Sequence, residues 1–299
     1  MVRRQGIFLG FLLLGVAGSI AFLVFQGGGH SPDRVISYPP LDILEETRRE
    51  EPPVVQEDDL VPVSPPEKLA DPAPRLYLVL DDAGQSWDEM EMFSALTVPY
   101  TVAVLPGLPQ SQEVLRQAQS RGYQVILHQP MEAFNGQNPG PGAIFANQSI
   151  EESLEILREN LGRYSGVVGL NNHMGSRITS DPSFVRPLLR EVKAQELFFL
   201  DSLTTGKSVV SAVAAEEGIP VLVRDVFLDH HRSEEEIRGQ LDRALEIARC
   251  RGQVIMIGHV TVPETARVLI ERQDEILREG FRFLPLSCAW EACDASAWN

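Results

Sequence analysis

The feature that most constrains the fold is an alternation of short apolar runs with longer helix-like segments, which begins at Arg75. Such alternation indicates a parallel sheet or an α/β barrel, because a parallel strand returns to its sheet through a crossover helix. One helix-like segment starts with Ser149 and has Glu152 three residues later, a capping-box signature. The apolar runs lie at 76–80, 100–106, 124–128, 167–171, 197–201, 220–223, 253–259 and 281–285, and the helix-like segments at 110–121, 149–163, 182–195, 233–251 and 263–279. About eight strands in roughly 215 residues suit a compact, incomplete α/β barrel.

Polar side chains recur where these apolar runs end. In parallel α/β folds, ligands bind at the carboxyl ends of the strands, so Asp and His residues that repeat at this position predict one shared site. The residues concerned are Asp81-Asp82, His128, Asn171-Asn172-His173, Asp201-Ser202, Arg224-Asp225 with Asp229, and Gly258-His259.

These residue types favour a divalent metal. Catalytic zinc takes three ligands from His, Asp or Glu and leaves a position for water, whose pKa it lowers. A further carboxylate can accept the proton of that water, and a histidine can protonate a leaving group. Neighbouring residues of an extended strand point to opposite faces, so the chain must turn for Asp81 and Asp82 to reach one site, and Gly84 makes this easier.

The motifs at the strand ends resemble those of the divergent polysaccharide deacetylase family, relatives of the NodB-type carbohydrate esterases. They read LVLDDAG, LHQPM, GLNNHMGS, DSLTTGKS, RDVFLD and IGH, in this order, within residues 75–287. The resemblance implies an α/β fold, a distorted NodB-like barrel of seven β/α units. It also implies a divalent metal, usually zinc, and hydrolysis of acetyl groups on sugars.

The same resemblance implies a role for each matching residue. Asp81 corresponds to the catalytic base and His259 to the general acid. Arg224 corresponds to the residue that orients the base, and Asp225 or Asp229 would orient His259 as a carboxylate partner. The metal ligands implied are Asp82, His128 and His173. The chain departs from the NodB pattern because its two metal histidines come from different strands, and because Val260 follows Gly-His where the family often has proline.

Each of these residues also has a purely structural interpretation. Asp201 is equally suited to binding loop backbone amides, and Asn171 and Asn172 either fix loops or donate to an oxyanion. Arg224 could be a buried ion-pair partner. Trp87 suits either sugar stacking or core packing, and the adjacent His230-His231 pair is poorly placed to chelate one ion.

The N-terminal part of the chain predicts export. Residues 7–25 contain no charge and follow Arg3 and Arg4, which favours a single-pass anchor with the rest of the chain outside the cytoplasm. A cleaved signal peptide followed by secretion is the alternative. Residues 32–74 hold ten of the 21 prolines and eleven acidic residues, which is typical of a disordered spacer. We therefore expect an anchor or signal at 1–30, a linker at 31–74, a deacetylase-like domain at 75–290 and a tail at 291–299.

The net charge of −16 argues against nucleic acid as a partner, because phosphate binding needs clustered Lys and Arg. The three cysteines, Cys250, Cys288 and Cys293, lack the spacing of a zinc ribbon. Cys288 and Cys293 could close a small loop in an oxidising compartment.

Together these observations predict a metal-dependent hydrolase of the bacterial cell envelope, held on the inner membrane with its domain in the periplasm. Its expected substrate is an acetylated polysaccharide such as peptidoglycan, and its glycan specificity is expected to reside in groove loops such as 132–148. The alternative is a catalytically inactive protein of the same fold that binds glycan or a protein partner.

Overall fold

The computed structural model describes residues 73–290. The predicted membrane segment at 7–25, nearly all of the predicted linker, the tail at 291–299 and Cys293 lie outside the described residues. Within 73–290, no helix is both long and apolar enough to cross a bilayer.

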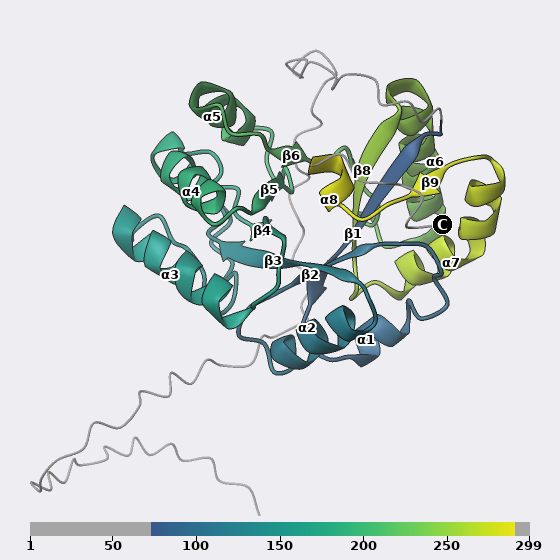
Figure 1. Cartoon of the computed structure of the whole chain (residues 1–299), viewed down its shortest axis with the longest axis horizontal. Coiled ribbons are helices and arrows are strands. Elements are labelled where there is room, and N and C mark those ends of the chain that lie inside the picture. Colours follow the sequence, from purple (N-terminus) through teal and green to yellow (C-terminus); the bar gives the residue numbers. More distant parts are fainter. Residues whose placement is uncertain (1–72, 291–299) are drawn as a thin grey trace, which may run out of the picture. The chain divides into compact units, whose positions relative to one another are not determined.

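One sheet of parallel strands forms the centre of the described domain (Figure 1). Its order is β6-β5-β4-β3-β2-β1-β8-β7, and β9 pairs with the start of β1. The strands are β1 (Arg75–Ala83), β2 (Thr101–Val104), β3 (Gln124–Met131), β4 (Gly169–Met174), β5 (Phe198–Asp201), β6 (Leu222–Val223), β7 (Val226–Phe227), β8 (Gln253–His259) and β9 (Arg282–Phe283). The predicted α/β class with parallel strands is therefore confirmed, and the described residues form one sheet of nine strands, where the family resemblance implied a distorted barrel of seven β/α units.

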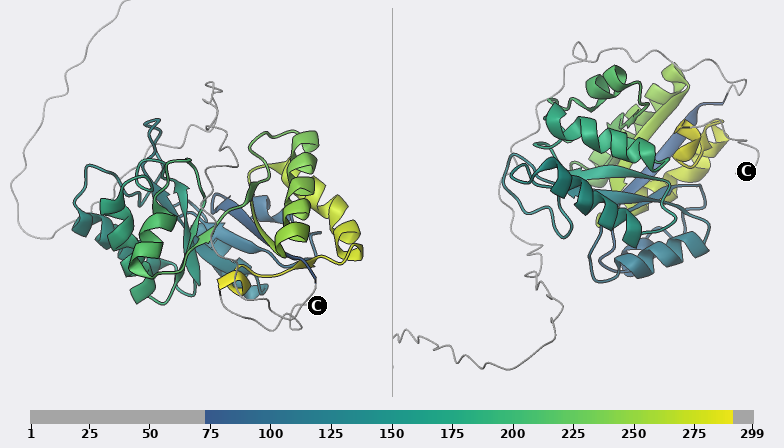
Figure 2. Two further views of the ribbon diagram at one scale, coloured as in Figure 1. Left: turned by 90° about the horizontal axis from the view of Figure 1, so that it is seen from above. Right: turned by 60° about the vertical axis from the view of Figure 1, so that its left-hand side comes forward.

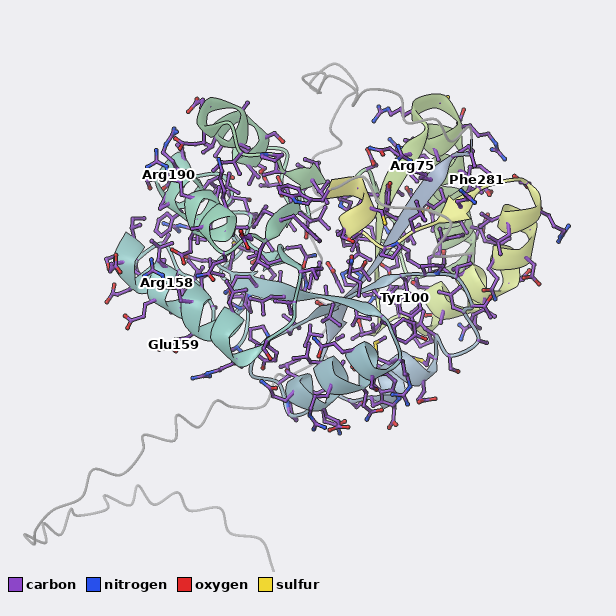
Figure 3. The ribbon with its side chains drawn as sticks, in the orientation of Figure 1. Arg75, Tyr100, Arg158, Glu159, Arg190 and Phe281 are labelled. Carbon is purple, nitrogen blue, oxygen red and sulfur yellow. The ribbon has the colours of Figure 1, made fainter. Side chains whose placement is uncertain are left out.

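Helices α1 to α7 connect the strands and lie around the outside of the sheet, whereas α8 follows the last strand and lies over the inner face (Figures 1 and 2). They are α1 (Asp88–Glu91), α2 (Ser111–Ser120), α3 (Ile150–Arg163), α4 (Pro182–Ala194), α5 (Val210–Glu217), α6 (Glu234–Arg251), α7 (Pro263–Arg278) and α8 (Ser287–Trp290). The predicted capping box at the start of α3 is present. Ion pairs link neighbouring helices on the outer surface, where Figure 3 shows Arg158 and Arg190. Exposed pairs of this kind contribute little each.

The two ends of the sheet are joined by a single short segment. The backbone N–H of Arg224 donates to the carbonyl of Asp201 in β5, and that of Asp225 donates to the carbonyl of Ile255 in β8. The chain from β6 to β7 therefore pairs with β5 by its first half and with β8 by its second. The sheet curls into a half-barrel with an inner and an outer face.

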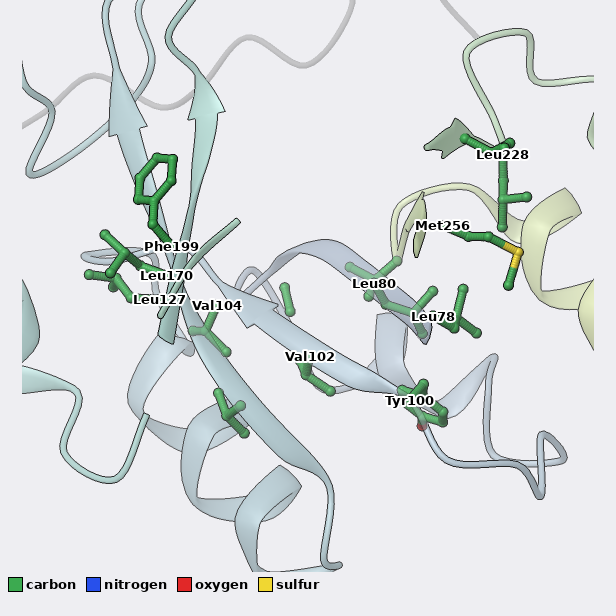
Figure 4. Packing of buried hydrophobic residues seen from close by; sticks show 14 of the residues in the cluster. Leu78, Leu80, Tyr100, Val102, Val104, Leu127, Leu170, Phe199, Leu228 and Met256 are labelled. Atoms are coloured by element: carbon green, nitrogen blue, oxygen red, sulfur yellow. The ribbon is translucent and has the colours of Figure 1, made fainter. Parts of the chain in front are cut away.

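The two faces of the sheet pack into different apolar clusters. In β1, Leu76, Leu78 and Leu80 join the outer cluster with the helices, part of which Figure 4 shows. Tyr77 and Val79 face the inner cluster instead, because side chains of a strand alternate between faces.

The inner face is covered at the amino ends of the strands by the C-terminal segment. The backbone N–H groups of Leu286 and Ser287 donate to the side chains of Thr101 and Gln124, the first residues of β2 and β3. The Tyr77 hydroxyl donates to the carbonyl of Cys288 in α8. Cys288 is disulfide-bonded, whereas Cys250 is an exposed free thiol. Access to the inner face is consequently left to the carboxyl ends of the strands.

Candidate metal centre and catalytic residues

The alternation of side chains along the strands explains why the predicted residues meet. Asp81 follows Tyr77 and Val79 on the inner face of β1, and His259 follows Ile255 and Ile257 on the inner face of β8. In the parallel pairing of these strands, Asp81 lies opposite His259. His128 and Asn171 are likewise paired across β3 and β4. The polar residues thus form the top layer of the inner core, at the carboxyl ends of the strands.

Asp82 reaches the same site through an irregular backbone. The pairing of β1 with β2 shifts between Leu80 and Ala83, so the strand holds one extra residue there. Asp82 has a φ of 66°, in the left-handed region that aspartate tolerates better than most residues. Gly84 has a φ of 135°, and a Cβ atom there would lie 2.8 Å from Ser111 Oγ. The predicted turn therefore exists, and Asp82 itself takes part in it.

Three predicted metal ligands lie together at this turn. His128 Nε2 lies 3.2 Å from Asp82 Oδ1, His173 Nδ1 lies 3.0 Å from the same oxygen, and the two nitrogens are 3.1 Å apart. Ligand atoms bound tetrahedrally to one zinc ion at about 2.0–2.1 Å are roughly 3.3 Å apart. The three residues therefore fit a single small divalent cation, with His128 offering Nε2 and His173 offering Nδ1.

The carboxylate of Asp82 supports the same assignment. Within residues 73–290, Oδ1 is buried and has no hydrogen-bond partner, despite the two imidazole nitrogens beside it. Burial alone would raise the pKa of Asp82, but the imidazoles of His173 and His128 hold it well below its usual range. A buried anionic oxygen without a donor is costly unless a cation meets it. A divalent metal held by the three residues would supply that charge.

Asp81 has different surroundings and is not one of the three residues that offer ligand atoms. Its carboxylate accepts hydrogen bonds from Asn171 Nδ2 at 2.9 and 3.1 Å, and its Oδ2 is 3.6 Å from His128 Nε2. Only 2% of Asp81 is exposed, and this burial raises its pKa while the charges of His128 and His259 lower it. A carboxyl group with a raised pKa is better suited to accept a proton than an ordinary aspartate.

His259 is held by Asp229, one of the two predicted alternatives. Its Nδ1 and backbone N–H each lie 2.7 Å from a different oxygen of Asp229. The hydroxyl of Thr265, at the start of α7, donates to the same carboxylate. Burial would lower the pKa of His259, but the bond to Asp229 and the other nearby carboxylates raise it to about 9. The imidazole is therefore a protonated group that can donate.

Asp225 and Arg224 make other contacts. Asp225 accepts the backbone N–H of Ile255, so of the two candidates only Asp229 contacts His259. Arg224 donates to the carbonyls of Ser202 and Leu203, and burial lowers its pKa to about 10. Within the described residues, Arg224 has no hydrogen bond to Asp81, and the donor found there is Asn171.

Asp201 and Asn172 fasten the loop that follows β5. Asp201 accepts the backbone N–H of Leu203 and the hydroxyl of Ser208. The Asn172 side chain accepts the backbone N–H of Ser202 and donates to the carbonyl of Met174. Both residues therefore bind loop backbone, as their structural interpretation expects, and Asn172 lies between Asn171 and His173 in β4.

Sequence reasoning missed the contributions of Ser202, Thr265 and Phe227. The Ser202 hydroxyl accepts from Asn171 Nδ2, and the Phe227 ring lies 5.0 Å from the ring of His259. Ser202 and Phe227 lie within the DSLTTGKS and RDVFLD motifs, but the sequence assigned neither of them a contact, and Thr265 lies in none of the motifs. Trp87 is partly buried, packs on the outer core and lies beneath the guanidinium of Arg121.

Comparisons with known proteins are consistent with this arrangement. An uncharacterised protein of Escherichia coli K12, YibQ, is 34% identical over 197 residues, which cover 66% of this chain and 61% of that protein. An uncharacterised protein of Haemophilus influenzae is 33% identical over 202 residues, covering 65% of this chain and 69% of that protein. The crystal structure of an uncharacterised protein from Agrobacterium tumefaciens C58 has the same fold, with a TM-score of 0.68 over 80% of this chain and 99% of that one, at 23% identity. The family model of divergent polysaccharide deacetylases matches residues 78–290, so this chain belongs to the divergent polysaccharide deacetylase family.

Proposed function

We propose that this protein is a metal-dependent hydrolase that removes acetyl groups from a polysaccharide of the bacterial cell envelope. The observation that carries the proposal is the separation of roles at the end of β1. Asp82 faces two imidazole nitrogens, while Asp81, one residue earlier, is held by an amide and lies opposite His259. A site that only held a metal would not need Asp81 and His259 in addition.

Asp82, His128 and His173 would hold the metal, for which we propose zinc because two imidazoles and one carboxylate match its catalytic sites. The chemistry that such a metal supplies when bound is activation of a water molecule and polarisation of the acetyl carbonyl.

The protein's own groups would move the protons. Asp81, buried and fixed by Asn171, accepts the proton of the attacking water. His259, protonated and fixed by Asp229, donates a proton to the departing amine of the sugar. Because β1 and β8 are neighbours, base and acid lie at one end of the inner face, where α8 does not block access.

The proposed substrate and location follow from the exported character of the N-terminal sequence. Residues 7–25 would anchor the chain in the inner membrane, with residues 75–290 in the periplasm. An acetylated glycan such as peptidoglycan is the polymer within reach there. Cleavage of the apolar segment as a signal peptide would instead release the same domain outside the membrane.

The test is acetate release from chitooligosaccharides and peptidoglycan by the zinc-loaded, full-length protein. We expect Asp81→Asn to abolish turnover and retain stoichiometric zinc, because the amide cannot accept the proton and Asp81 is not among the three ligands. Full activity of Asp81→Asn would exclude its role as base. Stoichiometric zinc without acetate release from any glycan would contradict the proposed activity and favour a non-catalytic binding protein.

A further inference from the structure

We propose that Asn171 is a positioning residue that joins the catalytic base to the metal centre. Its amide nitrogen fixes Asp81, and its amide oxygen fixes which nitrogen of His128 faces the metal. This inference rests on the proposed function, in which Asp81 is the base and His128 a ligand.

The orientation of the Asn171 amide follows from its neighbours. An ionised carboxylate can only accept hydrogen bonds, so the amide group that faces both oxygens of Asp81 must be the NH₂. The carbonyl oxygen then faces His128 Nδ1 at 2.8 Å. That nitrogen must carry the hydrogen, which leaves the lone pair of a neutral His128 on Nε2. Nε2 is the nitrogen that lies beside Asp82 and His173.

Burial keeps water away from Asn171, so its amide can bond only to neighbouring protein groups. Asn171 is fully buried, and Asp81 and His128 are each 2% exposed. Its third contact, the Ser202 hydroxyl 3.1 Å from Nδ2, takes up the remaining capacity of the amide nitrogen. A buried amide with these partners is fixed in one orientation, because turning it over would place a carbonyl against a carboxylate.

The topology explains how a residue of β4 reaches one of β1. Two strands, β3 and β2, lie between them, but β2 ends at Val104, which is level with Leu127. On its other side Val104 pairs with Ala83, the last residue of β1, so β2 stands beside Asp81, and the contact runs over the inner face, to which Asp81, His128 and Asn171 all point. On that face Asn171 supplies the donor that the family resemblance expects from Arg224, whose own donors go to Ser202 and Leu203.

Two substitutions separate the two contacts of Asn171. Asn171→Leu removes both, with similar volume and no room for water. Asn171→Asp retains an acceptor for His128 Nδ1 but places a carboxylate where Asp81 needs a donor. Asn160→Leu is the matched control, because Asn160 is also a buried amide, bonded to Gln129 and to the Gly142 carbonyl away from the ligand atoms.

The measurements are the zinc affinity of the full-length protein, by competition with a chromophoric chelator, and the kcat and KM of acetate release. We expect Asn171→Leu to weaken zinc binding by about 10- to 100-fold and to lower kcat, as loss of a partner of a metal ligand does elsewhere. Asn171→Asp should keep zinc affinity and lose kcat by about tenfold or more at unchanged KM. Asn160→Leu should bind zinc as the wild type does.

Wild-type zinc affinity in Asn171→Leu would overturn the inference, and so would an equal loss of zinc in Asn171→Asp, Asn171→Leu and Asn160→Leu. The zinc measurement does not depend on turnover. If the wild-type protein bound zinc but released no acetate, the proposed function would fail while the link from Asn171 to His128 was still tested.

Discussion

At the scale of single residues, Asp81 and Asp82 show how two identical side chains acquire different chemistry. Burial raises the pKa of Asp81, whereas the imidazoles near Asp82 overcome the effect of burial and lower its pKa. The two carboxylates differ because they have different neighbours. The backbone turn at Asp82, with a φ of 66°, brings its carboxylate beside the histidines, whereas that of Asp81 is held by Asn171. Groups with perturbed pKa values that gather at a strand end are typical of functional sites.

The pH dependence of activity tests the His259–Asp229 pair. Because the pKa of His259 is raised from 6.5 to about 9, the acid stays protonated, and we expect activity to fall only as the pH rises through about 9. Asp229→Asn removes the negative charge, so the pKa of His259 should fall back towards its ordinary value and the alkaline limb should move to lower pH.

The measurement is kcat against pH for the wild type and Asp229→Asn. The raised pKa of His259 also predicts that the free energy of unfolding falls at alkaline pH, as activity does. A group whose pKa is raised by folding stabilises the native state fully below pH 6.5, and this contribution is lost as the pH rises through about 9. An unmoved alkaline limb in Asp229→Asn would show that His259 is not the acid, or that Asp229 does not control it.

At the scale of the elements, α7 packs beside the end of β8, and its Thr265 hydroxyl donates a hydrogen bond to Asp229. A Cβ atom on Gly258 would lie 2.9 Å from Thr265 Cγ2 and 3.5 Å from Asp229 Oδ2, so glycine is required by packing at this position. We expect Gly258→Ala to lower the free energy of unfolding by about 1–3 kcal/mol, as overpacking of a filled core does. Its zinc-loaded activity should fall as well, because Asp229 holds His259.

The matched variant is Gly258→Ala with Thr265→Ser, which removes Cγ2 and keeps the hydroxyl that donates to Asp229. Urea unfolding should show that the second substitution recovers most of the lost stability. If Thr265→Ser gives no recovery, the steric contact is not the reason for glycine at position 258.

Much of the fold could be predicted because its elements have strong periodicity and end signals. The predicted runs at 76–80, 124–128 and 253–259 all lie within observed strands, and the capping box at Ser149 marks the start of α3. The helix α5 was missed because its sequence, VSAVAAEE, is nearly uniform in small residues and has no clear polar face. The strand β7 was missed because it is two residues long and continues β6 across Arg224 and Asp225.

The candidate site could be predicted as a set of residues but not as a set of contacts. Asp225 and Asp229 each accept a backbone N–H from the residue 30 positions later, Ile255 and His259, because β7 and β8 are paired in register. Only this register decides which acid meets the histidine. The role of Asn171 depends in the same way on the register of β3 with β4 and on the contact with Asp81 across the inner face, which no local pattern reveals.

At the scale of the whole molecule, metal binding and folding must be linked, because the three ligands come from β1, β3 and β4. They meet only when the sheet is formed, so a metal that binds the folded chain stabilises it. Zinc at 100 times its dissociation constant would add about 2.7 kcal/mol to the free energy of unfolding. For a domain of this size, that corresponds to a rise in Tm of roughly 5–10 °C.

Thermal unfolding of the full-length protein with chelator and with zinc measures this linkage. His173→Ala should lose the zinc-dependent rise in Tm, because it removes one of the three ligand atoms. Asp229→Asn should retain the rise, since Asp229 bonds to His259 and Thr265 and to no ligand of the metal. A rise that persisted in His173→Ala would place the ion elsewhere, and a rise lost in both variants would mean that the acid and the metal centre are not independent. The expected pattern, lost in one variant and kept in the other, would show that the Asp229–His259 pair and the metal centre are separable, in contrast to the base Asp81, which Asn171 joins to the ligand His128.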